Sequence, residues 1–170
     1  MSDTIETQEI ERDGRSYLVE YSVDFNFDAP WNCQELVGNI DVKENYMHKS
    51  PGQRIIKGLY TDYLYDFQDA VAKAKKQWVI PEEGETLGQA AVKLVEKEVK
   101  WLDGYINDQW TYICVTVFDV TEEKCKHCAP SDSLSGIEFH YNTDDEYITG
   151  IVKEMIENVE YERLNKPIAA

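Results

Sequence analysis

The chain has 170 residues, with 33 Asp and Glu against 17 Lys and Arg, which gives a formal net charge of −16. Direct nucleic-acid binding is excluded as the first interpretation, because contacts to phosphate are built mainly from Lys and Arg. Hydrophobic residues make up 42% of the chain, enough for a packed core, so a fully disordered chain is also excluded.

Length and composition predict one compact domain. We expect a flexible segment over 1–12, a single α+β domain over 13–165 and a C-terminal tail over 166–170. No stretch approaches the ~18 consecutive apolar residues of a membrane span, and residues 1–14 are too polar for a signal peptide. The four cysteines form no framework of spaced pairs, so we expect reduced thiols, a cytoplasmic location and no membrane partner.

The negative charge is unevenly distributed along the chain. Residues 1–42 carry a net charge of −8, residues 43–76 carry +3, residues 77–129 carry −5 and residues 130–170 carry −6. The acidic residues therefore gather toward both ends, with one mildly basic stretch between them.

Alternating polarity predicts strands in the first part of the chain. Residues 15–23 alternate with the period of a half-buried strand. Residues 24–34 are expected to form a loop with aromatic anchors. Two shorter strands are predicted over 36–42 and 54–60.

The middle of the chain predicts two helices. Apolar residues recur at helical intervals over 67–78, and a second helix is predicted over 86–107. Thr86 and Gln89 are three residues apart, as in a capping box, in which each side chain satisfies a free backbone N–H of the first turn.

The last third of the chain predicts two strands and a helix. Residues 110–120 are apolar on both faces, which indicates a central strand, and a hairpin loop leads to a strand over 134–140. Thr143 and Glu146 form a second candidate capping box at the start of the last helix. The order of elements predicts an α+β fold: a mostly antiparallel sheet of about five strands, with three helices packed on one face.

The only local pattern with metal-ligand spacing is Cys125-Lys126-His127-Cys128. A structural zinc site needs four ligands, and the sequence supplies no second closely spaced pair. We therefore interpret this segment as a hairpin tip with two thiols and expect no metal. A metal site stays the alternative, completed by scattered residues such as His127, His140, His48 or Cys33.

The sequence shows no recognisable catalytic signature. None of the three histidines accompanies a nucleophile motif, and no glycine-rich phosphate loop is present. We expect no enzyme activity and no cofactor. A metal-dependent enzyme is the last of the alternatives.

Trp31 is the aromatic residue whose role the sequence leaves open. It follows Pro30 in a predicted loop, where a large ring either closes the edge of the core or contacts a partner. Both interpretations are retained, and Trp31 is kept as a candidate partner-binding residue. The other tryptophans have the spacing of ordinary core residues.

Two groups of acids in the last helix are candidate partner-binding residues. Asp144 and Asp145 fall in the expected first turn, where the helix dipole alone explains negative charge. The second group recurs along the expected outer surface with few neighbouring bases: Glu154, Glu157, Glu160 and Glu162. Solubility explains one acidic helix, but for an excess of 16 charges mimicry of a polyanion is a serious alternative.

Three stretches of the chain carry a resemblance to a known family. They lie within 65–78, 88–117 and 131–138, and include Tyr-Asp-Phe-Gln-Asp-Ala, Gly-Gln-Ala-Ala-Val and Asn-Asp-Gln-Trp-Thr-Tyr. These stretches resemble a family of small, mostly uncharacterised proteins encoded by tailed bacteriophages and prophages. Together these ranges contain 52 of the 170 residues. The family pattern has Trp where this chain has Ser135, so the third stretch matches less well.

The resemblance implies a phage gene expressed in the bacterial cytoplasm, and no catalytic residues. In that context we expect an acidic inhibitor that binds the basic cleft of a host nucleic-acid-binding defence protein, a restriction or CRISPR effector, by DNA mimicry. The alternative is a phage accessory or structural-interaction protein without inhibitory activity. The sequence also allows a homodimer.

Overall fold

The computed structural model describes residues 4–44, 47–122, 126–141 and 146–165. The chain folds as two compact units. Unit 1 comprises residues 1–27 and 111–170, and unit 2 comprises residues 28–110. Each unit has its own sheet, its own helices and its own hydrophobic core.

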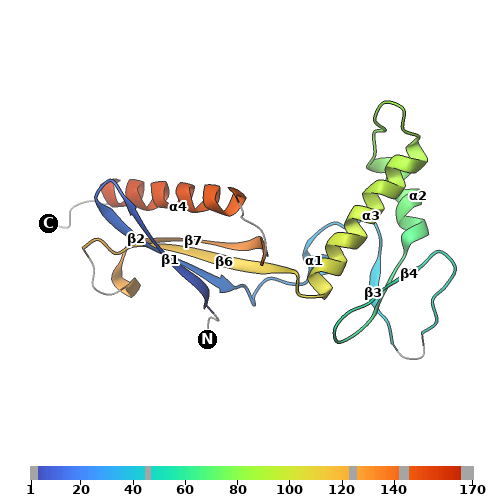
Figure 1. Cartoon of the computed structure of the whole chain (residues 1–170), viewed down its shortest axis with the longest axis horizontal. Coiled ribbons are helices and arrows are strands. Elements are labelled where there is room, and N and C mark those ends of the chain that lie inside the picture. Colours follow the sequence, from blue (N-terminus) through green and yellow to red (C-terminus); the bar gives the residue numbers. More distant parts are fainter. Residues whose placement is uncertain (1–3, 45–46, 123–125, 142–145, 166–170) are drawn as a thin grey trace. The chain divides into compact units, whose positions relative to one another are not determined.

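Unit 1 is a four-stranded antiparallel sheet with one long helix. The strands, in the order β1-β2-β6-β7, are Thr4–Arg12, Arg15–Val23, Trp110–Asp119 and Ser131–His140. The first residue of β6, Trp110, is counted in unit 2. Helix α4, Glu146–Asn165, lies along one face of this sheet (Figure 1). A short 3-10 turn, Lys126–Cys128, precedes β7.

The core of unit 1 follows from the alternation of its central strands. Tyr17 and Val19 of β2 and Val115 and Val117 of β6 are fully buried on the same face. The pairing places Val19 opposite Val117, so apolar side chains from neighbouring strands form one surface. The inward side of α4 covers that surface with Ile148, Val152, Met155, Ile156 and Val159.

Unit 2 combines a small antiparallel sheet with one short helix and two longer helices that pack together. Its strands, in the order β3-β5-β4, are Ile40–Val42, Tyr63–Tyr65 and Arg54–Ile56. The helices are α1, Pro30–Cys33, α2, Phe67–Gln77, and α3, Leu87–Ile106. Ala70 and Ala74 of α2 and Ala91 of α3 are buried in one cluster, and these small residues suit the close packing of α2 on α3.

The α+β class and the antiparallel pairing are confirmed. The strand over 15–23, the helix over 67–78, and the central strand over 110–120 are close to β2, α2 and β6. The capping box is present as predicted: the Gln89 N–H donates to the Thr86 hydroxyl, and the Thr86 N–H donates to the Gln89 side chain.

The number and arrangement of elements differ from the prediction. Within the described residues seven strands form two sheets and there are four helices, in place of one sheet of about five strands with three helices. Strand β5 escapes prediction because its three residues, Tyr63–Tyr65, are too few to show a period. Strands β3 and β4 are shorter than their predicted ranges.

Residues 4–12, which we expected to be flexible, form strand β1. Thr4–Arg12 pairs with β2 from the Thr4–Ser22 pair to the Arg12–Arg15 pair. The polar composition of this segment is misleading, because an edge strand with exposed side chains needs few apolar residues. The single domain over 13–165 stays a prediction, since two compact units can still unfold together. The predicted tail over 166–170 and the capping role of Thr143 lie outside the described residues.

Candidate functional site

The two units carry very different net charges. Unit 1 has 19 acidic and 7 basic residues, a net charge of −12, and unit 2 has 14 and 10, a net charge of −4. Three quarters of the excess therefore belongs to one unit. The candidate partner-binding acids of the last helix belong to this unit.

Helix α4 presents two of the predicted acids without internal contacts. Glu154 and Glu162 are exposed, and neither makes a hydrogen bond or an ion pair with any other residue that the structure describes. Their carboxylates are thus available to a partner. Glu154 precedes Glu157 by three positions, which places the two side chains on neighbouring parts of the helix surface.

The other two predicted acids of α4 bind the β1–β2 hairpin. Glu157 accepts a hydrogen bond from Nη2 of Arg12 at 3.3 Å. Glu160 is half-buried and accepts a hydrogen bond from the Tyr17 hydroxyl at 2.8 Å. These contacts join helix to sheet, so the four glutamates do not form one uniformly free surface.

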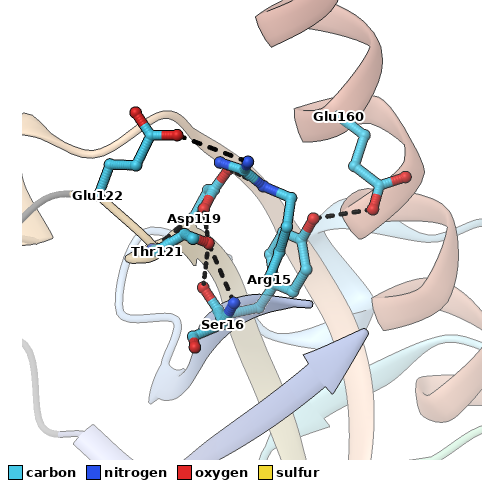
Figure 2. A network of polar contacts seen from close by, with 7 residues as sticks. Arg15, Ser16, Asp119, Thr121, Glu122 and Glu160 are labelled. Atoms are coloured by element: carbon cyan, nitrogen blue, oxygen red, sulfur yellow. Dashed lines mark hydrogen bonds and ion pairs between the residues drawn. The ribbon is translucent and has the colours of Figure 1, made fainter. Parts of the chain in front are cut away.

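A buried ion pair lies where β2 begins and β6 ends. Asp119 is only 2% exposed and accepts hydrogen bonds from Arg15 at 2.6 and 3.1 Å. It also accepts from the Thr121 hydroxyl at 2.6 Å, and the Thr121 hydroxyl in turn accepts from the Ser16 N–H at 3.0 Å. Figure 2 shows these side chains converging, with the Glu160 carboxylate pointing from α4 toward the sheet.

The network changes the ionisation of its members. Burial by itself raises the pKa of Asp119, but hydrogen bonds from Thr121 and Arg15 outweigh it and hold that pKa below its usual value. Burial and the hydrogen bond to Glu160 raise the pKa of Tyr17 to about 12. At neutral pH Asp119 is therefore ionised and Tyr17 neutral, which is the state in which both hydrogen bonds form.

Apart from Glu160, the residues of this network are not among the predicted site residues. Asp119 falls at an inward position of the alternation over 110–120, and an acid there signals a buried partner. Arg15 begins the strand that pairs with β6. Its match to Asp119 depends on strand pairing over 104 residues of sequence separation, which the sequence does not specify.

Trp31 lies in unit 2, within helix α1 rather than in a loop. Its ring is half-buried against the core of that unit, with its centroid 5.2 Å from that of Tyr63 and 5.7 Å from that of Tyr105. Packing thus accounts for much of its surface, and its role in binding a partner stays a prediction. Asp144 and Asp145 lie outside the described residues.

The candidate metal ligands lie only partly within the described residues. Cys125 lies outside the described residues, whereas Cys128 and Cys33 are exposed and form no disulfide with another described residue. Among the residues that the structure describes, no group of three or more His, Cys, Asp or Glu side chains is placed to hold a metal ion. Over the same part of the chain, no helix has both the length and the apolar character needed to cross a membrane.

Comparisons with family models, curated proteins and solved structures found no match to this chain. The resemblance to the phage family therefore stays a prediction, and the proposed function depends on the charges and contacts described above.

Proposed function

We propose that this protein is an acidic, phage-encoded inhibitor that acts in the bacterial cytoplasm. It binds the basic cleft of a host nucleic-acid-binding defence protein, such as a restriction or CRISPR effector, in place of DNA. The observation that supports this proposal is the net charge of −12 on unit 1, against −4 on unit 2. A charge needed only for solubility has no reason to gather in one unit.

A concentrated negative surface suits a partner that normally binds phosphates. Opposite charges steer the two proteins together and raise the association rate, an effect that salt weakens. Glu154 and Glu162 provide carboxylates without internal ion pairs within the described residues. Helix α4 is held on the sheet by buried apolar residues and by the Tyr17–Glu160 hydrogen bond, so these carboxylates are presented on a fixed surface. Binding therefore costs less ordering of the acidic helix.

The experiment begins with the capture of partners. The full chain is immobilised and exposed to bacterial lysate at low salt, and bound proteins are eluted with a salt gradient and identified. Each purified candidate is then saturated with labelled duplex DNA, and the unlabelled chain is added. The proposal expects displacement of the DNA and an affinity that falls steeply as ionic strength rises.

A matched pair of double variants separates local from overall charge. Glu154→Lys with Glu162→Lys changes two exposed acids of unit 1, whereas Asp41→Lys with Glu83→Lys changes two exposed acids of unit 2. Both variants alter the net charge by the same amount. We expect the unit 1 variant to lose DNA displacement, chiefly through a slower association rate, and the unit 2 variant to retain most of it.

Reversal of Glu157 or Glu160 is a poorer test, because each residue bonds to the β1–β2 hairpin. Equal losses in the two double variants would show that only overall charge matters. A partner that binds the chain and DNA together, with an affinity insensitive to salt, would contradict mimicry. That result would favour an accessory or structural-interaction protein instead.

A further inference from the structure

A groove of about 320 Å³ lies in unit 1 between helix α4 and strands β1 and β2. Ile10, Val152 and Ile156 line it, and all three belong to or pack against the hydrophobic core. The volume is at the lower end of the range for small-molecule sites. The groove thus offers an apolar surface to a small ligand.

The charged lining of this groove is cationic, although its unit is strongly acidic. Arg12 and Lys153 both line it, and none of the described residues that line it is acidic. Lys153 is exposed and makes no ion pair with another described residue. Two cations beside an apolar surface, in a unit of net charge −12, form a local site for an anion.

Arg12 has unused donor capacity. Its Nη2 donates to Glu157, and its Nε lies 3.8 Å from the exposed carboxylate of Asp13. Its Nη1 is buried and has no acceptor among the described residues. A buried donor without an acceptor is unfavourable, so a ligand oxygen that reached the guanidinium after a small rotation would gain a charge-assisted hydrogen bond.

We propose that this groove binds a small amphipathic monocarboxylate, such as a medium-chain fatty carboxylate. The hydrocarbon part lies on Ile10, Val152 and Ile156, and the carboxylate accepts hydrogen bonds from Lys153 and Arg12. A single negative charge fits because Arg12 is already paired with Glu157, which leaves Lys153 as the main uncompensated cation. A doubly charged phosphate would meet greater repulsion from the surrounding acids.

The test uses three probes on the full chain with labelled methyl groups: octanoate, octanol and acetate. We expect octanoate to bind at least about tenfold more tightly than octanol, with shifts confined to the methyl groups of Ile10, Val152, Ile156 and their neighbours. Acetate, which lacks the apolar part, is expected to cause no shift at the same concentration.

Lys153→Gln removes the exposed cation, and Lys97→Gln removes an exposed cation of unit 2 as a control. We expect about tenfold weaker octanoate binding in the first variant and no change in the second. Octanol binding as tight as octanoate binding, shifts outside the groove, equal effects of the two variants, or no binding at all would each overturn the proposal. None of these results bears on the DNA displacement test, which concerns other residues.

Discussion

In unit 2 the Glu98 carboxylate accepts hydrogen bonds from the N–H groups of Val37 and Gly38, at 2.7 and 3.0 Å, and from the Tyr65 hydroxyl. In unit 1 the Glu160 carboxylate accepts one hydrogen bond within the described residues, from the Tyr17 hydroxyl. Both units therefore pair a buried tyrosine with a helical glutamate. Glu98 accepts three internal hydrogen bonds, whereas Glu160 accepts one and keeps more acceptor capacity for water or a partner.

This contrast extends to the surfaces of the two units. Unit 2 offsets most of its acids with bases and has a net charge of −4, whereas unit 1 keeps −12. The same residue type thus fixes a loop in one unit and leaves charge exposed in the other. Mutations that remove individual carboxylates should therefore affect stability most where the internal contacts are most numerous.

The largest effect is expected from Glu98→Ala. The substitution leaves two backbone N–H groups and the buried Tyr65 hydroxyl without their acceptor, so we expect a loss of about 3 kcal/mol or more in the free energy of unfolding. Gly38 increases the constraint, because an added Cβ there would overlap the Tyr65 ring. Urea unfolding followed by tryptophan fluorescence measures this loss, since all four tryptophans lie in unit 2.

Glu96→Ala is the matched control on the same helix. Its carboxylate pairs with Arg54 at 2.8 Å, but both side chains are exposed by 40% or more. An exposed pair contributes about 0.2–1 kcal/mol. Similar losses for the two variants would contradict the view that Glu98 secures the loop.

Asp119→Ala is the corresponding deletion in unit 1. It leaves the Arg15 guanidinium, which is 17% exposed, without its buried counter-ion, and we expect a loss of about 3 kcal/mol. Far-UV circular dichroism follows unfolding of both units. If the chain unfolds as a single domain, the substitution shifts the unfolding curve followed by tryptophan fluorescence as much as the curve followed by circular dichroism. A tryptophan curve that does not shift would contradict the single-domain prediction.

Asp119 also predicts an acid dependence of stability. Its pKa is below the usual value in the folded state, so its contribution is complete above about pH 4 and is lost as pH falls through the folded pKa. We expect Asp119→Asn to reduce the fall in stability below about pH 4. If the free energy of unfolding of this variant fell as steeply below about pH 4 as that of the wild-type protein, other carboxylates would be the main cause of the fall.

Tyr17→Phe should have a smaller effect, because it removes one hydrogen bond and keeps the ring. We expect a loss of about 1.5 kcal/mol at neutral pH, the lower end for a bond to a charged group. The pKa of Tyr17 is raised to about 12, so its contribution is complete below about pH 10 and is lost as pH rises toward the folded value.

Urea unfolding at several pH values measures both effects of Tyr17. The wild-type protein should lose stability more steeply than Tyr17→Phe between about pH 10 and 12. Tyr65→Phe is the matched variant in unit 2, where burial and Glu98 also raise the tyrosine pKa. An equal loss of stability for wild type and Tyr17→Phe between about pH 10 and 12 would contradict the raised pKa of Tyr17.

The sequence predicted the elements whose signals are local and periodic. Apolar residues alternate along β2 and β6 and recur at helical intervals along α2 and α3. Each of these patterns can be recognised within a short stretch of sequence. The contacts that distinguish the units cannot be recognised in this way, because Arg15 with Asp119 and Tyr17 with Glu160 are separated by 104 and 143 residues. The division into two units was not visible either, since both parts of unit 1 lie at opposite ends of the chain and no linker marks the boundary.

Apart from the control Glu96→Ala, the smallest effect of an alanine substitution is expected from Thr86→Ala, which tests a contact that the sequence did predict. The Thr86 hydroxyl accepts from the Gln89 N–H at 3.2 Å at the start of α3, and loss of such a cap costs about 1 kcal/mol. Thr86→Ser keeps the hydroxyl and should lose much less. The tryptophan unfolding curve reports both variants, because α3 belongs to unit 2.

A loss for Thr86→Ala as large as that for Glu98→Ala would mean that unit 2 depends on its local helix signals as much as on the long-range contacts of Glu98. That outcome would remove the contrast between a unit fixed by internal carboxylate contacts and a unit that leaves its carboxylates exposed.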